Sequence, residues 1–170
     1  KISQIHRVIR RHSSAVDFTN PKLTIRALGR MQVRQGAKIV SSKEWKTQTV
    51  RDLFFYIIAH PEGVTKEEIG EAFWPDADRD TIRLRFKNTI YRLRRALGND
   101  CIQFADDCYR FNRNLDFDYD VDTFLTELEN AKKANSTEEK IDHFHAAITS
   151  YRCQLLPKVD QDWVIVEREK

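Results

Sequence analysis

The chain has 170 residues, of which 41% are hydrophobic and 32% are charged. This composition is typical of a soluble globular protein with one domain or two small ones. No apolar run approaches the roughly 20 residues that span a bilayer, and the first residues lack the apolar core of a signal peptide. The sequence therefore argues against a membrane protein, and we expect no membrane partner.

Three cysteines occur in the chain, Cys101, Cys108 and Cys153, and none belongs to a CxxC pattern. An odd number without such spacing favours reduced thiols over a disulfide framework. We therefore expect a cytoplasmic protein.

Charge divides the chain into two parts. Residues 1–98 carry 20 Lys and Arg against 10 Asp and Glu, a net charge of +10, whereas residues 99–170 carry 9 against 16, a net charge of −7. Such asymmetry indicates two units, of which the first suits a polyanion and the second does not.

The first 20 residues are predicted to form the end of a helix and a linker. Ile2, Ile5 and Val8 have helical spacing, and a polar stretch follows them as far as Pro21. Because the chain begins inside this helix, we expect another domain upstream.

The apolar pattern then changes to a period of two. It predicts three short strands near residues 22–27, 31–33 and 39–40, which form a small antiparallel sheet. Two helices are predicted after the sheet. An apolar stripe at helical spacing places the first over residues 50–58, and a capping box of Thr65 and Glu68 starts the second.

The most informative segment is DTIRLRFKNTIYRLRRALG at residues 80–98. One side of this predicted helix is an apolar stripe: Ile82, Phe86, Ile90, Leu93 and Leu97. The opposite side is polar and basic, with Leu84, Asn88, Tyr91 and Arg95 at its centre, Lys87 and Arg92 beside them, and Arg83, Arg85 and Arg94 at the borders. Residues 79–98 hold seven Lys or Arg and one acid. A helix that serves only solubility usually mixes both signs, so this excess predicts contact with a polyanion.

A hairpin is predicted directly behind the basic helix, from β runs at 101–104 and 108–111 around a tip at 105–107. Strands, three helices and a hairpin in this order predict an α+β winged helix-turn-helix. In that fold the third helix enters the major groove of DNA and the hairpin flanks it.

Past residue 115 the chain becomes acidic and helical. Four carboxylates alternate at its start, Asp116, Asp118, Asp120 and Asp122. We interpret them as helix-start and linker carboxylates, since acids favour helix N-termini, and no other pattern supports a metal site there. An antiparallel helix pair is predicted next, near 121–128 and after a capping box of Ser136 and Glu139. A third helix begins near 160–163, and we expect the helical segment to continue beyond the chain.

Several segments resemble a family of bacterial transcription factors. YRLRRALG at 91–98, WP at 74–75 and YRF at 109–111 are similar to the OmpR-type winged helix. FDYDVDTFL at 117–125 and YRCQLLPKVDQDWVIVERE at 151–169 are similar to the opening of the bacterial transcriptional activation domain. That domain follows the winged helix in the Streptomyces antibiotic regulatory protein (SARP) family.

The resemblance implies a domain organisation and a function. Residues 1–20 resemble the last helix of a response-regulator receiver domain and its linker. Residues 21–114 resemble the winged-helix DNA-binding domain. Residues 115–170 resemble the first helices of an all-α, TPR-like activation or oligomerisation domain. The implied function is sequence-specific binding of double-stranded DNA by a transcriptional activator, as the output region of a two-component system. The implied partners are duplex DNA, RNA polymerase or other transcription machinery, and further protomers on direct-repeat sites.

The resemblance also implies roles for single residues. Four of them match groove-facing positions of the family, Lys87, Asn88, Tyr91 and Arg92. Asn88 suits adenine and Arg92 suits guanine, and Leu84 on the same face suits a thymine methyl. Phosphate or backbone contacts are expected from Trp74, Arg83, Arg94, Arg95, Arg110 and Arg113.

Two positions depart from the family's pattern. The wing tip at 105–107 is Ala-Asp-Asp, where the family has glycine and a basic residue. Phosphates repel these carboxylates, so we expect this tip to bind DNA weakly or to contact a protein, with Arg110 and Arg113 compensating in part. Cys153 stands where the family's YRG motif has glycine, so we expect no positive φ there.

Two other classes of function fit the sequence less well. No GxGxxG, P-loop, HExxH, GxSxG or CxxC pattern occurs, so we expect no enzyme, no catalytic residue and no cofactor. His143 and His145 are two residues apart on a predicted helix, do not share a face and predict no metal site. The alternative function is a protein-interaction or signalling module whose repurposed winged helix does not bind DNA, which the acidic wing tip favours.

Overall fold

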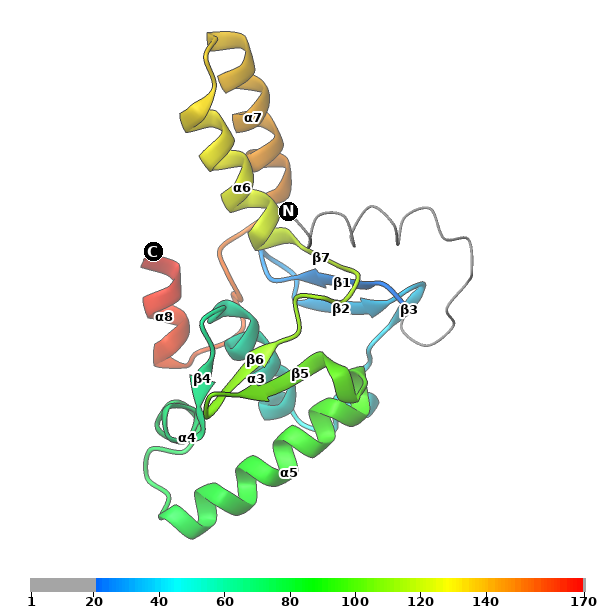
Figure 1. The fold of residues 1–170 in the computed structure, drawn as a ribbon, viewed down its shortest axis with the longest axis vertical. Helices are drawn as coiled ribbons and strands as arrows, with labels where there is room; N and C mark the ends of the chain where they lie inside the picture. The colour runs from blue at the N-terminus through cyan, green and yellow to red at the C-terminus, as the bar shows by residue number, and fades with distance from the viewer. Residues whose placement is uncertain (1–20, 170) are drawn as a thin grey trace.

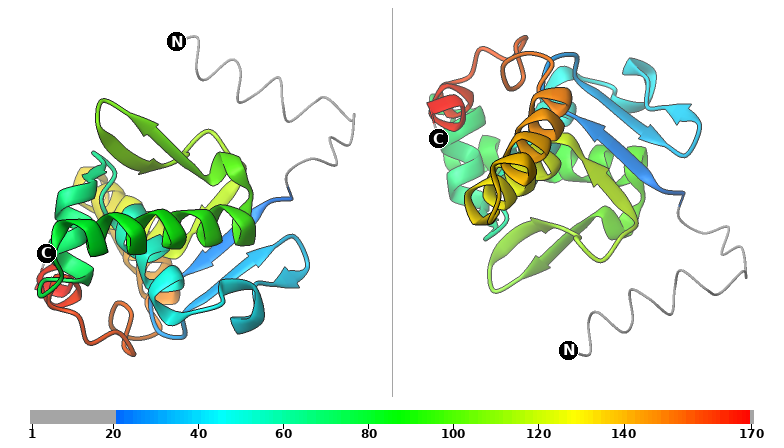
Figure 2. Two further views of the ribbon diagram at one scale, coloured as in Figure 1. Left: turned by 90° about the horizontal axis from the view of Figure 1, so that it is seen from below. Right: turned by 90° about the horizontal axis from the view of Figure 1, so that it is seen from above.

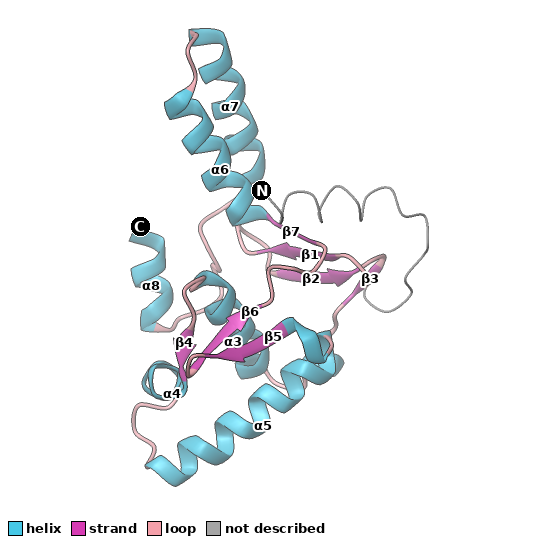
Figure 3. Cartoon of the chain, in the orientation of Figure 1, coloured by secondary structure: helices cyan, strands magenta, loops and turns pink. Residues whose placement is uncertain are grey.

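The computed structural model of the protein describes residues 21–169, which form a mixed α/β fold with two small sheets (Figures 1 and 3). The strands are β1 (Leu23–Arg26), β2 (Gln32–Gln35), β3 (Lys38–Ile39), β4 (Val64–Thr65), β5 (Ile102–Ala105), β6 (Cys108–Phe111) and β7 (Phe117–Tyr119). The helices are α2 (Ser42–Trp45), α3 (Gln48–Ala59), α4 (Lys66–Phe73), α5 (Arg79–Leu97), α6 (Asp120–Lys133), α7 (Thr137–Ser150) and α8 (Asp162–Glu169), with a 3₁₀ turn at Asn99–Cys101. The helix and linker predicted at 1–20 lie outside the described residues.

The first sheet has the strand order β3-β2-β1-β7. The antiparallel pairing of β1, β2 and β3 confirms the three predicted strands. The sequence did not predict β7, which pairs parallel with β1 and places Tyr119 opposite Ile25. Asp118 therefore lies in a strand, with its carboxylate 2.8 Å from the amine of Lys22, and its interpretation as a linker carboxylate was wrong. The helix-start interpretation is confirmed for Asp120 and Asp122, which stand in the first turn of α6.

Helix α3 forms the centre of the core. Its side chains Leu53, Phe54 and Ile57 are fully buried, as its predicted apolar stripe requires. The ring of Phe54 meets the edge of Phe111 from β6 at a centroid distance of 5.9 Å. Helix α3 thus packs on the hairpin, and its buried side chains belong to the same hydrophobic cluster as Leu23, Ile25 and Val33 of the first sheet.

Helices α4 and α5 make the helix-turn-helix. The predicted capping box is confirmed, because the Thr65 hydroxyl accepts from the Glu68 N–H while the Glu68 carboxylate accepts from the Thr65 N–H at 2.7 Å. The two helices approach closely at Gly70, where a Cβ would lie 2.9 Å from a methyl carbon of Ile82. Asp78 caps the start of α5, and Gly98 ends the helix with a φ of 101°.

The hairpin of β5 and β6 pairs with the short strand β4. Its tip is a tight turn in which Asp106 and Asp107 have positive φ angles of 52° and 57°. Among residues other than glycine, Asp and Asn tolerate this left-handed region best, so the acidic tip satisfies the turn geometry. Cys153 has no positive φ, as predicted from its departure from the glycine of the family.

Helices α6 and α7 pack side by side as the predicted antiparallel pair, which projects from the rest of the fold (Figures 1 and 2). The chain then returns to the end of β1 and to α3. The Leu156 N–H donates to the Ala27 carbonyl at 2.8 Å, and the ring of Trp163 on α8 packs against Tyr56 of α3 at 5.1 Å. Leu156, Val159 and Val164 belong to the same buried cluster as α3. The two oppositely charged parts of the sequence therefore share one core.

Two of the three cysteines, Cys101 and Cys153, give a simple test of this packing. Cys101 is buried, and burial raises the pKa of its thiol to about 12, whereas Cys153 is exposed. Because the thiolate is the reacting form, we expect iodoacetamide to modify Cys153 in the native protein and to spare Cys101 until the chain unfolds. Peptide mass spectrometry after a timed reaction measures both sites. Equal rates at Cys101 and Cys153 in the native protein would contradict the packing.

Candidate nucleic-acid interface

Helix α5 presents one broad polar face to solvent. The predicted stripe is confirmed, since Phe86, Ile90, Leu93 and Leu97 are buried, while Ile82 is half-buried against α4. All five side chains predicted to face bases are exposed: Leu84, Lys87, Asn88, Tyr91 and Arg92. The large apolar side chains among them, Leu84 and Tyr91, are each 62% exposed. Both therefore lie in solvent among the cations of α5.

The charge of this face is uncompensated inside the protein. Seven cationic side chains lie on α5, and within residues 21–169 none of them forms an ion pair with a carboxylate. Elsewhere on the surface such pairs are common, for example between Arg113 and Asp122. The helix therefore carries a positive potential directed to solvent, as an anion-binding surface requires.

The predicted phosphate contacts on α5 differ in their surroundings. Arg83 and Arg95 are exposed. Arg94 is half-buried, its Nη2 donates to the Ile102 carbonyl at 3.1 Å, and its buried Nε has no hydrogen-bond partner among the described residues. Arg94 therefore ties α5 to the hairpin in addition to any contact with a ligand.

Trp74 stands at the end of α4, in the turn before α5. Its ring lies 6.0 Å from that of Phe73 and is half-buried. With Arg85 of α5 it lines a small cavity of about 410 Å³. This places Trp74 beside the start of α5, where the resemblance puts a contact near the DNA backbone.

Arg110 and Arg113 lie apart from the polar face of α5. The Arg110 Nε donates to the Glu62 carbonyl at 2.7 Å, and its Nη1 lies 3.6 Å from the Asp106 carboxylate. Arg113 donates to Asp122 at 2.7 Å, at the start of α6, and its guanidinium lies over the Phe117 ring. In Figure 1, α6 and α5 are at opposite ends of the molecule. The structure thus gives both arginines partners within the fold.

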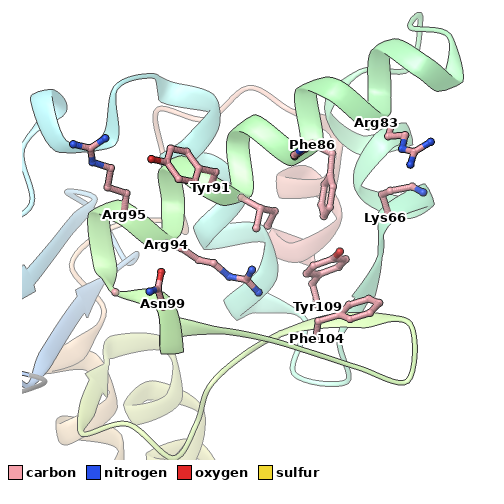
Figure 4. A pocket seen from close by; sticks show the side chains of 12 residues that line it. Lys66, Arg83, Phe86, Tyr91, Arg94, Arg95, Asn99, Phe104 and Tyr109 are labelled. Atoms are coloured by element: carbon pink, nitrogen blue, oxygen red, sulfur yellow. The ribbon is translucent and has the colours of Figure 1, made fainter.

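A groove of about 950 Å³ separates α5 from the hairpin (Figure 4). It is lined by Lys66, Arg83, Phe86, Lys87, Ile90, Tyr91, Arg94, Arg95, Gly98, Asn99, Phe104 and Tyr109. Five of these side chains are cationic, four are aromatic, and none is a carboxylate. The sequence did not predict that four of them belong to a site: Lys66, Asn99, Phe104 and Tyr109. For Phe104 and Tyr109 the available signal was the alternation of residues along the hairpin, because residues paired across two strands lie on the same face.

The aromatic side chains of the groove form a connected group. Phe104 and Tyr109 are paired across the hairpin with ring centroids 4.6 Å apart, and the Tyr109 ring meets Phe86 of α5 at 4.8 Å. Burial raises the pKa of the Tyr109 hydroxyl, and the nearby charges of Arg94 and Lys66 act in the opposite direction. The Tyr109 hydroxyl is therefore protonated at neutral pH.

Within residues 21–169, the histidines and carboxylates outside this groove do not assemble a metal centre. Among the described residues no group of three or more His, Cys, Asp or Glu side chains is placed to hold an ion. The Nδ1 of His143 lies 2.7 Å from the Glu127 carboxylate and joins α7 to α6. This contact gives His143 a structural role in the helix pair.

A helix-turn-helix followed by a hairpin defines the winged helix-turn-helix fold, here joined to a helical segment. The arrangement is similar to that of Mycobacterium tuberculosis EmbR in complex with a low-affinity phosphopeptide, with a TM-score of 0.67 and 19% sequence identity. The likeness covers 85% of this chain and 40% of the EmbR chain, and at this identity it shows a shared fold. No protein-family model and no curated protein sequence matches the chain. Within residues 21–169, no helix has the length and apolar character to cross a membrane.

Proposed function

We propose that the protein is a sequence-specific regulator of transcription that binds double-stranded DNA through α5. The observation that carries this proposal is the exposed face of α5, on which cations lie without ion pairs while the opposite stripe is buried. The similarity to EmbR supports the fold on which the proposal rests, and the partner is argued from the side chains.

The dimensions of α5 suit the major groove. Its 19 residues form a rod about 28 Å long, and a helix with its side chains is roughly 10–12 Å wide, close to the roughly 12 Å of the groove. Asn88 and Arg92 are four residues apart and therefore share one side of the helix. Asn88 can form two hydrogen bonds with adenine and Arg92 two with guanine, while Leu84 lies one turn earlier for a thymine methyl.

Arginines at the margins of this side fix the helix on the DNA backbone. Arg83 and Arg95 are exposed and free of intramolecular ion pairs among the described residues, so they are available to phosphates. Arg94 also fixes the position of the hairpin relative to α5, because its Nη2 donates to the Ile102 carbonyl. Such contacts set register and orientation without reading sequence.

The helical segment is proposed to contact other protomers or the transcription machinery. Its helix pair exposes large apolar side chains: Leu125, Ile141, Phe144, Ile148 and Tyr151. Exposed apolar patches of this kind mark protein contacts more often than simple solvent-facing surface. By resemblance to the SARP family we further propose a TPR-like fold for this segment, binding to direct repeats and activation of transcription.

Selection of bound duplexes from a random pool tests this proposal. We expect enrichment of a defined sequence, present as direct repeats when two protomers bind. Recovery of the starting pool without enrichment would contradict sequence-specific binding. A protein-interaction module without DNA binding, which the acidic tip and the exposed apolar side chains of α6 and α7 favour, predicts that outcome.

A further inference from the structure

We propose that Trp163 of α8 is a positioning residue for DNA binding, although it lies in the acidic part of the chain. Its ring fixes the end of α4, and through that end it sets the position of α5 on the DNA. The inference rests on the proposed function and gives the segment after the helix pair a part in the choice of sequence.

Three aromatic rings from three helices form one cluster. The Trp163 ring meets Tyr56 of α3 edge to face at a centroid distance of 5.1 Å and lies 6.4 Å from Phe73 of α4. The rings of Tyr56 and Phe73 also meet edge to face, at 5.5 Å. Aromatic pairs at such distances attract one another beyond the effect of the area they bury. Helix α8 therefore helps to hold α4 against α3.

The Trp163 ring is held in place by contacts of its own segment. Its Nε1 donates to the side-chain oxygen of Gln161 at 2.6 Å. One turn further along α8, the Glu167 carboxylate lies 3.5 Å from Nε2 of His60 at the end of α3. Arg168 donates to two carbonyls of the loop that leads into α8, at 2.8 and 2.7 Å. These contacts attach α8 to α3 and keep the ring against α4.

Phe73 connects this cluster to the start of α5. It is the last residue of α4 and stands directly before the turn of the helix-turn-helix. The ring of the next residue, Trp74, lies 6.0 Å from that of Phe73. Asp78, which caps α5, lines the small cavity beside this turn together with Trp74 and Arg85. A displacement of Phe73 is therefore passed to the first turns of α5.

Base reading depends on the position of α5 more strongly than backbone binding does. The hydrogen bonds proposed for Asn88 and Arg92 require donor–acceptor distances of about 2.7–3.2 Å at the base edges. Attraction to phosphates falls off slowly with distance, so exposed cations such as Arg83 and Arg95 keep most of it when α5 shifts. Loss of the Trp163 ring should therefore reduce the preference for the selected sequence and leave non-specific affinity unchanged.

Three variants test the inference on the duplex selected by the wild-type protein and on an unrelated duplex. Trp163→Ala removes the ring, and Trp163→Phe keeps an aromatic ring beside Tyr56 and Phe73. Phe124→Ala is the matched control, because Phe124 is a half-buried aromatic residue of α6 whose ring packs on Tyr151 at 5.5 Å. We expect Trp163→Ala to lower the ratio of specific to non-specific affinity about tenfold, with the salt slope unchanged. Trp163→Phe should keep most of the ratio, and the control should discriminate like wild type.

Amide hydrogen exchange measures the same displacement without DNA. Trp163→Ala should raise the exchange rates of residues 74–81 about tenfold and leave those of α6 and α7 unchanged, whereas Phe124→Ala should do the reverse. Trp163→Leu keeps apolar volume without the ring. It replaces Trp163→Ala in both measurements if unfolding temperatures show that the alanine variant does not fold.

The outcomes separate this inference from the proposed function. If Trp163→Ala and Phe124→Ala discriminate equally between the duplexes, or if exchange in the turn is unchanged, Trp163 does not position α5 and the proposed function stands. Equal losses of specific and non-specific affinity would also overturn the inference, because they indicate fewer folded molecules and not a displaced helix. If wild type binds both duplexes equally, the function itself fails.

Discussion

Asp120→Ala is expected to lower the free energy of unfolding by about 2–4 kcal/mol. Asp120 is 3% exposed, and its carboxylate accepts the Ala27 N–H at 2.9 Å and the Leu28 N–H at 3.1 Å. Both donors come from the chain just after β1, about 90 residues away, where Leu28 forms an isolated antiparallel bridge with Leu155. Alanine would leave two N–H groups without partners, and burial makes that costly.

Denaturant unfolding followed by circular dichroism measures this effect. Asp118→Ala is the matched control, because Asp118 stands two residues earlier and its ion pair with Lys22 has side chains that are 61% and 46% exposed. We expect the control to change stability by no more than about 0.5 kcal/mol. Similar losses for the two variants would show that Asp120 does not link α6 to the first sheet.

Arg92→Ala is expected to cost about 1–3 kcal/mol of binding to the selected duplex and to relax the choice of base at one position. The guanidinium is exposed on the outward side of α5, so its removal leaves the core intact. Arg92→Lys isolates the chemistry, because lysine keeps the charge but lacks the planar fork that pairs with guanine. It should keep the salt slope of wild type and still lose discrimination. Affinities for the selected duplex and for single-base variants measure both properties.

Arg94→Ala provides the contrasting result. Its expected effect is a similar loss for every sequence, because Arg94 is proposed to contact the DNA backbone and its Nη2 donates to the Ile102 carbonyl of the hairpin. Equal, sequence-independent losses for Arg92→Ala and Arg94→Ala would refute the division between base reading and backbone contact.

Local patterns in the sequence were sufficient for most of the elements. The capping boxes at Thr65 and Ser136 were predicted because they depend on residues three positions apart. The buried stripe of α5 was predicted because helical periodicity is a property of one segment. Strand β7 was missed because it has three residues, alternates with aspartates and finds its partner β1 far along the chain. Such pairing is decided by tertiary contacts that no local pattern reports.

The candidate site, like the fold, was predicted only where it depends on one segment of the sequence. A helical wheel was enough to place Leu84, Asn88 and Arg92 on the exposed side of α5, because orientation on a helix follows from spacing. The groove was missed because it combines Lys66 of α4 with Phe104 of the hairpin. The half-buried state of Arg94 also depends on the position of β5. Contacts between elements that are distant in the sequence could be identified only from the structure.

Titration of duplex binding against salt tests the central claim most directly. The proposed function predicts that the logarithm of the association constant falls linearly with the logarithm of salt concentration, with a slope of about −3 or steeper, because several phosphates release counterions. Replacing Arg83, Lys87 and Arg95 together with alanine should flatten that slope by about 2–3. A wild-type protein that binds no duplex, or binds with an affinity independent of salt, would contradict the assignment of α5 as a DNA-binding helix.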